Sequence, residues 1–384
     1  MKPFLCSTLF LALSSTVIWA DESTSMRCDA MVVATPSPVL QARSVVKGLN
    51  NPWGLAFLPD GRMLVTERSG QLRLADSNGS VSKPFGGVPA VHAQGQGGLL
   101  DIALDPDFAA NQRIYLSYAE SGSGNTSGTA VFRARLDLAN ISLHDGTVIF
   151  RQSPKTSGNG HYGSRLVFGR DSLLFVTLGE RQKFDPAQDG AAHLGKVVRI
   201  RSDGSIPPDN PFAKTSGVLP QIWSLGHRNP QGAALHPQTG QLWVSEHGAM
   251  GGDEINIARA GKNYGWPIIS YGRHYGGGKI GEGSSKSGIE QPACYWDPSI
   301  APGNMTFYTG QRIPQWQGSL FVTALKDQML VRLTLDGNRI TGHEKLLTNI
   351  GKRLRDVRVG PDGWLYLLTD ERDGEILRVS AAER

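Results

Sequence analysis

Short runs of apolar residues separated by tight turns recur six times along the chain. Each copy has an apolar strand, a turn, a second apolar strand, a polar loop and a third strand. In the first copy these are residues 55–58, the Pro-Asp-Gly turn at 59–61, residues 63–67 and residues 72–74. Runs of this length bounded by Gly, Pro and Asp are typical of β-strands. The later copies begin with first strands at Leu99, Leu166, Ala233, Met305 and Val357.

A repeat of roughly 40 to 65 residues made only of strands indicates a β-propeller, because one such sheet cannot bury both faces by itself. A β-sandwich would lack the internal repeat, and a β-solenoid would have a shorter period. We therefore predict an all-β fold, a six-bladed β-propeller of four-stranded antiparallel blades, as a single domain over residues 21–384. Residues 42–47 precede the first copy, and we expect them to supply the last strand that closes the ring.

Composition supports this interpretation and limits the classes of ligand that we expect the protein to bind. The chain has 384 residues with 47 glycines and 22 prolines, as many tight turns require. Its net charge is +5, and the Lys and Arg residues are scattered rather than gathered on one stripe. We expect no nucleic-acid partner, since proteins that bind nucleic acids concentrate their basic residues on one surface. A small anionic ligand is compatible with the net positive charge.

The N-terminus has the pattern of an export signal. Lys2 precedes a mostly apolar run over residues 4–19, and Ala20 stands before a polar segment. We predict a signal peptide over residues 1–20, a periplasmic protein and no membrane insertion after cleavage. The alternative is a short membrane anchor, but the run falls below the ~18 residues that a spanning helix needs.

Two cysteines remain after the signal, Cys28 and Cys294. In an oxidising compartment they could form a disulfide that ties the N-terminal segment to a distant loop, or they could stay as free thiols. Two cysteines are too few for a thiolate metal site.

Polar residues flank the predicted strands in a way that gathers them at one end. Within a hairpin the residues before the first strand and after the second lie together, opposite the turn. The candidates at these positions are His161, Gln96, Arg228, Asn229, Lys326, Arg353 and Arg355. Convergent Arg and Lys favour a ligand with several negative charges. The alternative is an ion-pair network with Glu180, Glu246 and Asp356.

A glycine-rich segment over residues 246–254, followed by Tyr264, suggests a metal loop. Glycines allow backbone carbonyls to turn toward a cation, and carboxylates such as Glu254 add oxygen ligands. The alternative is a flexible glycine loop without a metal. The sequence has no dinucleotide-binding fingerprint, no phosphate-binding loop and no G-x-S-x-G nucleophile motif.

Several motifs in combination resemble the soluble glucose and aldose sugar dehydrogenases that depend on pyrroloquinoline quinone (PQQ). The resemblance covers nearly all of the mature chain. The chain is more similar to the broad-specificity aldose branch than to the glucose enzymes. The motifs are Gln96-Gly97-Gly98, His161 with Ser164-Arg165, Gly226-His227-Arg228-Asn229-Pro230, Asp253-Glu254-Ile255-Asn256, Asn263-Tyr264-Gly265-Trp266-Pro267, Leu325-Lys326 and Arg353-Leu354-Arg355-Asp356.

The resemblance implies a cofactor site. Gln96, Lys326, Arg353 and Arg355 would hold the carboxylates and edge of PQQ, while Arg228 and Asn229 would contact its quinone oxygens. The carbonyls of Gly248 and Ala249 would bind a Ca²⁺ that touches PQQ. Glu254 and Tyr264 resemble ligands of a further, structural Ca²⁺.

The resemblance also implies a reaction. His161 would be the general base on the anomeric hydroxyl of an aldose, Arg228 would stabilise developing charge, and the product would be a lactone. Electrons would leave to an external acceptor, and we expect a monomer or homodimer. The other hypotheses are a non-catalytic, calcium-stabilised binding propeller and a lactone hydrolase.

Three positions depart from the glucose enzymes. Glu180 replaces an Asp beside the base, and its longer arm bears on how His161 is oriented. Ala249 replaces a Pro, which leaves a carbonyl ligand in place. The tryptophan that faces the sugar has no clean match, since Trp296 is offset by one from the Asp297-Pro298 register, and this departure concerns substrate preference more than activity.

Overall fold

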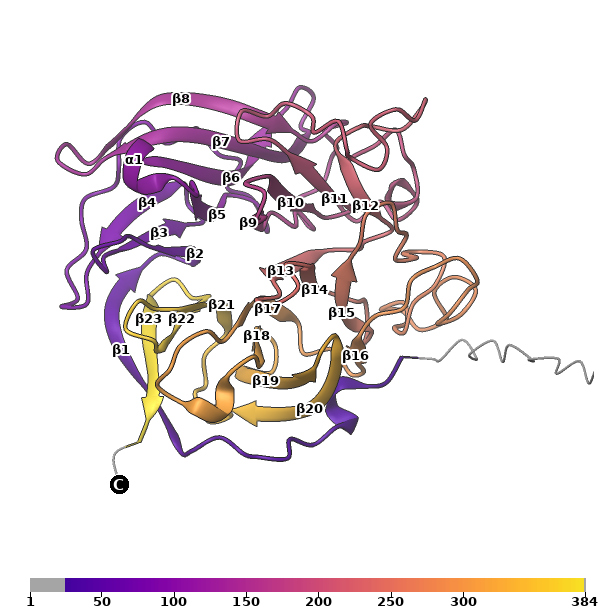
Figure 1. Cartoon of the computed structure of the whole chain (residues 1–384). Coiled ribbons are helices and arrows are strands. Elements are labelled where there is room, and N and C mark those ends of the chain that lie inside the picture. The colour runs from indigo at the N-terminus through magenta and orange to yellow at the C-terminus, as the bar shows by residue number, and fades with distance from the viewer. Residues whose placement is uncertain (1–24, 383–384) are drawn as a thin grey trace, which may run out of the picture.

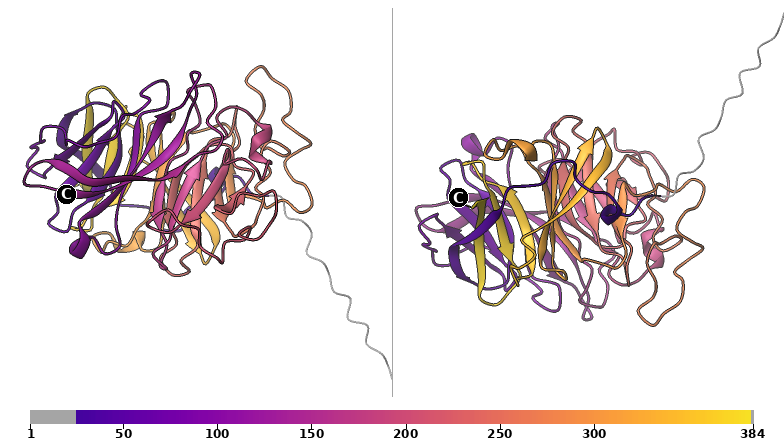
Figure 2. Two further views of the ribbon diagram at one scale, coloured as in Figure 1. Left: turned by 90° about the horizontal axis from the view of Figure 1, so that it is seen from above. Right: turned by 90° about the horizontal axis from the view of Figure 1, so that it is seen from below.

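Six β-sheets stand around a central axis in the computed structural model, which describes residues 25–382 (Figure 1). Five of the sheets have four strands and one has three. Viewed from its edges, the ring is a thick disc (Figure 2). The predicted six-bladed β-propeller is confirmed. The blade that begins with β2 has only three strands, and beyond its last strand it has an isolated bridge between Ala75 and Val81.

We number the blades 1 to 6 in chain order. Blade 1 contains β2 (Pro52–Phe57), β3 (Met63–Glu67) and β4 (Gln71–Ala75). Blade 2 contains β5 (Leu99–Leu104), β6 (Arg113–Ser121), β7 (Ser127–Asp137) and β8 (Ser142–Arg151). Blade 3 contains β9 (Leu166–Phe168), β10 (Leu174–Leu178), β11 (Lys196–Ile200) and β12 (Ile222–Leu225). Blade 4 contains β13 (Pro230–Leu235), β14 (Leu242–Glu246), β15 (Asp253–Ala258) and β16 (Cys294–Trp296). Blade 5 contains β17 (Pro302–Phe307), β18 (Leu320–Ala324), β19 (Met329–Asp336) and β20 (Arg339–Leu346). Blade 6 contains β21 (Leu354–Val359), β22 (Leu365–Thr369), β23 (Gly374–Ala381) and the N-terminal β1 (Leu40–Leu49).

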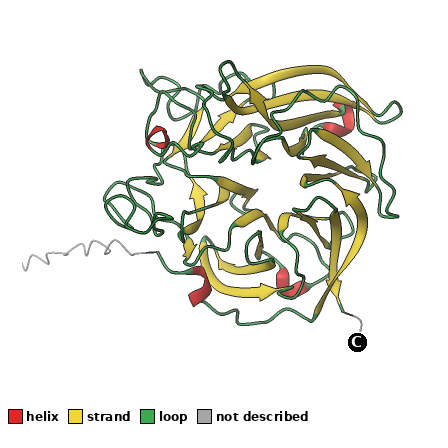
Figure 3. Cartoon of the chain, turned by 180° about the vertical axis from the view of Figure 1, so that it is seen from behind, coloured by secondary structure: helices red, strands yellow, loops and turns green. Residues whose placement is uncertain are grey.

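Helices are short and peripheral (Figure 3). The α-helix α1 (Phe108–Asn111) lies in the turn between β5 and β6, and the 3₁₀ helices are η1 (Cys28–Ala30), η2 (Asp185–Ala187) and η3 (Pro314–Trp316). No helix in the described chain is long and apolar enough to cross a membrane.

The first two strands of every blade form an antiparallel hairpin. In blade 4, for example, Leu235 pairs with Leu242 beside the turn, and Pro230 pairs with Glu246 at the opposite end. The loop before the first strand and the loop after the second therefore emerge together. This arrangement repeats in the other five blades and brings twelve chain segments to one face of the ring.

Each of the six interfaces between neighbouring blades has its own hydrophobic cluster. Between blades 6 and 1, Phe57 meets Tyr366 edge to face with ring centroids 4.9 Å apart. Between blades 4 and 5, Trp243 meets Phe307 in the same manner at 5.7 Å. Because burial of each large apolar side chain contributes about 1.5–3 kcal/mol, stability comes mainly from these interfaces.

The ring is closed by the N-terminal strand, as the sequence predicts for residues 42–47. In β1, Ala42 pairs with Val379 and Val46 pairs with Ile376 of β23. Of the two alternatives for the cysteines, the structure has the disulfide: Cys28 is bonded to Cys294 at the start of β16. The predicted signal peptide, residues 1–20, lies outside the described residues.

Candidate functional site

A cavity of about 150 Å³ opens on the axis, at the face where the twelve segments meet. Every blade contributes to its lining: Trp53, Arg68, Gln96, Leu100, Tyr162, Gly163, Asn229, Gln231, His247, Ala301, Leu325, Arg353, Arg355 and Asp370. The predicted residues Gln96, Asn229, Arg353 and Arg355 are thus brought together. Concave sites with a few convergent polar groups are the usual binding sites of small molecules and cofactors.

His161 lies beside this cavity and is tied to it through the backbone. Its N–H donates a hydrogen bond of 2.8 Å to the Gln96 side-chain oxygen. The next residues, Tyr162 and Gly163, line the cavity itself. His161 has φ +51°, which is uncommon for a residue with a side chain, and backbone strain of this kind clusters at functional sites.

Glu180 orients the imidazole of His161. The Nδ1 atom of His161 lies 2.5 Å from Oε1 of Glu180, and the other oxygen of Glu180 accepts the backbone N–H of Phe184 at 2.7 Å. A carboxylate at Nδ1 fixes the tautomer that leaves Nε2 able to accept a proton. Within the described chain no hydrogen bond engages Nε2 of His161.

The pKa values of this pair suit a base. Burial lowers the pKa of His161, and although Glu180 raises it, the balance stays below the ordinary 6.5. Burial raises the pKa of Glu180, but the hydrogen bond and charge of His161, the Phe184 N–H and the charge of Arg228 together outweigh burial and hold it below its ordinary value. His161 is therefore neutral, and Glu180 ionised, near pH 7.

Arg228 and Asn229 lie on the blade 4 side of His161. The backbone N–H of Arg228 donates to Glu246 at 2.8 Å, and its Nη1 donates to the carbonyls of His247, at 3.1 Å, and Gly248. The guanidinium carbon lies 5.1 Å from the centroid of the Trp266 ring. The Nε atom of Arg228 is buried without a hydrogen-bond partner among the described residues.

The remaining cations differ in how they are held. Arg355 pairs with Asp370 at 2.7 Å and bonds the Gln231 side chain at 2.8 Å, yet its buried Nε has no partner in the described chain. Arg353 lines the cavity and is 46% exposed. Lys326 is 57% exposed and donates to the carbonyl of Ser299 at 2.8 Å, so it does not line the cavity. The sequence left open an ion-pair network as the alternative to ligand binding. Arg355 does form an ion pair, although its partner, Asp370, is not one of the carboxylates expected for that network.

The residues of the predicted metal loop surround a smaller cavity of about 20 Å³ next to Arg228. Gly248, Glu254 and Tyr264 line it, whereas Ala249 packs in an apolar cluster with Trp266. Burial and the nearby charge of Glu246 raise the pKa of Glu254 to about 8. The Tyr264 hydroxyl is already engaged, since it donates to Ile257 and accepts from the N–H of Arg259 at 2.9 Å.

No cluster of three or more His, Cys, Asp or Glu residues in metal-binding geometry occurs within residues 25–382. A cation in the smaller cavity would therefore depend on carbonyl oxygens together with Glu254. The space is sufficient, because a cavity of ~10–15 Å³ already holds a water molecule.

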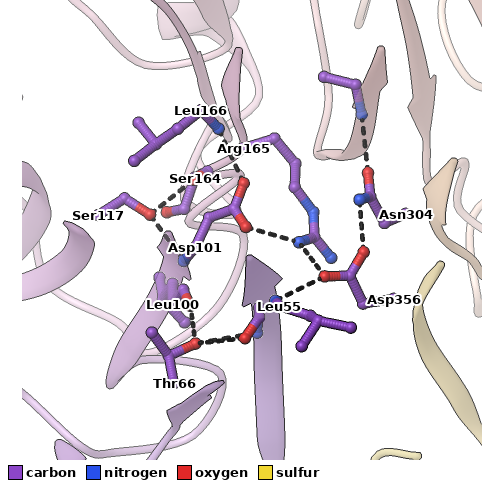
Figure 4. Close-up of polar contacts among 12 residues, drawn as sticks. Leu55, Thr66, Leu100, Asp101, Ser117, Ser164, Arg165, Leu166, Asn304 and Asp356 are labelled. Atoms are coloured by element: carbon purple, nitrogen blue, oxygen red, sulfur yellow. Dashed lines mark hydrogen bonds and ion pairs between the residues drawn. The ribbon is translucent and has the colours of Figure 1, made fainter. Parts of the chain in front are cut away.

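A buried polar network forms the floor of the main cavity (Figure 4). Arg165 pairs with Asp101 at 3.0 Å and with Asp356 at 3.6 Å, while its Nε donates to the Gln231 carbonyl at 2.7 Å. Its guanidinium carbon also lies 3.9 Å from the centroid of Trp53. The network thus fixes Trp53 and Gln231, which line the cavity above it.

Sequence reasoning missed the contribution of blade 1. Trp53 stands at the start of its first strand and Arg68 directly follows its second strand, the positions that identified the candidates in the other blades. The same positional rule could have found both residues.

A second opening lies at the opposite end of the axis. This cavity of about 540 Å³ is lined mostly by apolar residues of the six first strands, together with Arg358. It contains no predicted site residue. Size alone therefore does not identify the functional end; the convergence of charged and hydrogen-bonding groups does.

Comparison with known proteins agrees with this geometry. Residues 49–378 match the model of the Glucose / Sorbosone dehydrogenase family. The chain is 50% identical over 337 residues to aldose sugar dehydrogenase YliI of Escherichia coli, covering 86% of this chain and 90% of that protein. The chain therefore belongs to the Glucose / Sorbosone dehydrogenase family.

Solved structures give the same relationship. The soluble aldose sugar dehydrogenase of Escherichia coli in its apo-form has a TM-score of 0.87 and 48% identity, covering 90% of this chain and 100% of that chain. The PQQ-bound form of the aldose sugar dehydrogenase of Streptomyces coelicolor has a TM-score of 0.75 and 31% identity, covering 90% of this chain and 99% of that chain.

Proposed function

We propose that this protein is a PQQ-dependent aldose sugar dehydrogenase that oxidises the anomeric C1 hydroxyl of aldoses to lactones. The observation that carries the proposal is the oriented His161–Glu180 pair beside an axial cavity lined by Arg353 and Arg355. The family membership and the PQQ-bound relative support the same assignment.

The chemistry of the cavity fits PQQ, a planar tricarboxylate with an ortho-quinone. Arg228 and Arg355 each have a buried Nε–H without a partner in the described residues, so an anionic acceptor would satisfy donors that are costly to leave unpaired. Arg353, Gln96 and Asn229 would hold the rest of the cofactor, with Lys326 at the rim. When bound, PQQ supplies the two-electron acceptor for the hydride from C1.

His161 performs the proton step. Its free Nε2 would accept the proton of the anomeric hydroxyl, while the Nδ1–H bond to Glu180 stabilises the imidazolium that results. Arg228 lies close enough to His161 to help depress its pKa, and its positive charge would stabilise negative charge that develops nearby. The buried network around Arg165 fixes the positions of Trp53 and Gln231, which line the cavity next to these groups.

The smaller cavity fits Ca²⁺. Glu254 there is a carboxyl whose raised pKa reflects burial beside Glu246, a situation that a divalent cation relieves. Glu254 and Tyr264 would be ligands of a structural Ca²⁺ there, whereas the carbonyls of Gly248 and Ala249 would hold a second Ca²⁺ that touches PQQ. A bound calcium ion would act as a Lewis acid toward an oxygen of the cofactor.

We propose further that the protein is exported to the periplasm, where its electrons pass to an external acceptor. The N-terminal pattern of residues 1–20 supports export, and the Cys28–Cys294 disulfide is of a kind that persists in oxidising compartments. Fractionation of the host, with mass spectrometry of the mature N-terminus, tests this: we expect cleavage near Ala20 and recovery with periplasmic markers. An uncleaved cytoplasmic protein contradicts it.

The enzymatic proposal is tested by reduction of a dye. The purified protein is mixed with PQQ, CaCl₂, an aldose and a reducible dye, and each component is omitted in turn. We expect turnover only when PQQ and aldose are both present, and a loss of at least about 100-fold in His161→Ala, since general-base catalysis contributes 10²–10⁴-fold. The control is His144→Ala on the exposed strand β8, which should keep full activity. Absence of PQQ binding, or full activity in His161→Ala, contradicts the proposal.

A further inference from the structure

Three aromatic side chains form one wall beside the proposed base, and we call Phe184, Trp266 and His274 the aromatic wall. The ring centroids of Phe184 and Trp266 lie 5.3 Å apart, and those of Phe184 and His274 lie 6.1 Å apart. Phe184 comes from the turn after β10, whereas the other two come from the loop between β15 and β16. Two blades therefore meet in this wall.

Phe184 is connected directly to the base. Its backbone N–H donates to Oε2 of Glu180 at 2.7 Å, and Oε1 of the same carboxylate holds His161. On the other side of the wall, Arg228 lies over Trp266. The wall thus borders both residues that the proposed reaction uses.

The local structure maintains the exposed Phe184 ring at a cost. Arg181, Gln182 and Phe184 all have positive φ, at +59°, +59° and +62°, a conformation that costs energy for residues with side chains. Phe184 is 36% exposed, and only seven large hydrophobic side chains are exposed in the described part of the chain. Trp266 and His274 cover part of the ring, and the rest stays open to solvent.

A second observation points to a ligand. The Nε1 atom of Trp266 is buried and has no hydrogen-bond partner among residues 25–382. Trp266 also lines the small cavity next to Arg228. Buried indole N–H groups usually find an acceptor, so an oxygen ligand that enters this small cavity would supply one.

We propose that Phe184 is the specificity-determining residue of the sugar site, where its ring packs on the apolar C–H face of a pyranose. This inference rests on the proposed function and names the residue that selects its substrate. A cyclic aldose presents such a face on one side and hydroxyls at its edge, so an aromatic wall next to the polar His161–Glu180 pair suits its two kinds of surface.

The test compares Phe184→Ala, Phe184→Tyr and Phe184→Leu with the wild type. The control is Ile206→Ala, since Ile206 is also 36% exposed and follows β11, away from the wall. We expect Phe184→Ala to raise KM for aldopyranoses by about tenfold or more, because packing on an aromatic ring is lost. The kcat and the Kd for PQQ should stay within about twofold, since the alanine keeps the N–H that bonds Glu180. Phe184→Tyr should restore KM, and Ile206→Ala should not change it.

A binding measurement separates this inference from the proposed function. A 1,5-anhydro-alditol, which lacks the anomeric hydroxyl and cannot be oxidised, is titrated calorimetrically into the PQQ-loaded wild type and variants. We expect its Kd to rise in Phe184→Ala by the same factor as KM. Unchanged KM and Kd in Phe184→Ala overturn the inference, even when the wild type is an active dehydrogenase.

A purely structural role has a different signature. It would lower kcat, weaken PQQ binding and shift the acid limb of the pH profile through Glu180, and that result also overturns the inference. If Phe184→Ala does not fold, Phe184→Leu decides, because leucine keeps an apolar side chain without a flat ring. Its KM should then be higher than that of the wild type. If the wild type has no PQQ-dependent activity, the proposed function fails with it.

Discussion

The properties of His161 are set by its neighbours rather than by the residue type. Burial lowers its pKa, Glu180 raises it, and Arg228 lowers it again, with a final value below 6.5. The Glu180 side chain, longer than the aspartate of the glucose enzymes, still reaches Nδ1 because the turn after β10 folds back and donates the Phe184 N–H to the second oxygen. Glu180 therefore fixes the orientation of the base in this chain.

The pH dependence of kcat/KM tests this account of His161. The base must be neutral, so activity should fall as pH decreases through its pKa, and the acid limb should lie below pH 6.5. Glu180→Gln removes a charge that raises this pKa, so the limb should move to still lower pH. The variant should also lose about 10- to 100-fold in activity, because the tautomer is no longer fixed. A limb that stays in place, or moves to higher pH, contradicts the assignment.

Arg355 offers a test of cofactor binding at the same scale. Arg355→Met removes a buried guanidinium whose Nε has no partner in the described chain. Hydrogen bonds to charged groups contribute ~1.5–3 kcal/mol, so the Kd for PQQ should rise by about 10- to 100-fold. Arg339→Met, at a side chain that is 75% exposed, is the control and should leave the Kd unchanged. Equal Kd values for Arg355→Met and wild type would falsify a role in holding PQQ.

Side-chain identity was predictable from the sequence to a larger extent than side-chain direction. The position relative to the strands was enough to select Gln96, Asn229, Arg353 and Arg355, all of which line the cavity. It could not indicate that Lys326 bonds Ser299 outside the cavity or that the Tyr264 hydroxyl is used by Ile257. These outcomes depend on contacts between segments that are distant in the sequence.

At the scale of the strands, a hydroxyl residue recurs at one position in every blade. The second strands carry, near their ends, Thr66, Ser117, Thr177, Ser245, Thr323 and Thr369, all of them buried. In blades 1 to 4 this hydroxyl donates to a backbone carbonyl of the next blade, as Ser117 does to Ser164 at 2.6 Å and Ser245 does to Gly303 at 3.0 Å. In blade 5, Thr323 instead donates to Asn304 of its own blade. The repeated hydroxyl is visible in the sequence, but only the folded ring shows that it links neighbouring blades.

The floor network gives a stability prediction for these strands. Asp101→Asn removes a carboxylate that pairs with Arg165 and Arg358, each at 3.0 Å. Loss of one partner from a buried ion pair costs about 3–5 kcal/mol, so the free energy of unfolding in urea should drop by that order. Asp145→Asn is the control, since Asp145 is 76% exposed in its pair with Arg135, and should change it by about 0.5 kcal/mol or less. Equal free energies of unfolding for Asp101→Asn and Asp145→Asn would contradict a stabilising role of the buried network.

The repeat predicted the strands well because every copy has the same alternation of apolar runs and turns. It missed α1, since four residues are too few to show a helical period. It also did not distinguish the three strands of blade 1 from the four of the others. The segment after β4 bonds to that strand through the N–H groups of Ser82 and Phe85, which donate to Leu74 at 2.8 Å and Leu72 at 2.9 Å, but it forms no regular strand.

At the scale of the whole molecule, the ends of the chain hold the ring together. β1 completes blade 6 by pairing with β23, and the preceding segment continues past blade 5 to the disulfide on blade 4. The sequence indicated the closing strand because residues 42–47 precede the first copy. It left the cysteines undecided, because their pairing depends on where the N-terminal segment runs.

Removal of the disulfide should therefore lower stability without altering the site. The bond joins residues 266 apart, and loss of a native disulfide typically costs about 2–5 kcal/mol. In Cys28→Ser with Cys294→Ser we expect a lower Tm, while the Kd for PQQ remains as in the wild type. The wild type treated with reductant should show the same loss of Tm. A Tm equal to that of the oxidised wild type contradicts a stabilising role.

We propose that His161 and the axial cavity together support transfer of hydride from C1 of an aldose to bound PQQ. The most direct measurement is single-turnover bleaching of the PQQ-loaded protein, without dye, by an aldose with protium or deuterium at C1. We predict slower bleaching with deuterium at C1, no difference with deuterium at C6, and no bleaching in His161→Ala that still binds PQQ. Bleaching in His161→Ala at the wild-type rate, or failure of the loaded wild type to bleach with any aldose, would contradict the account.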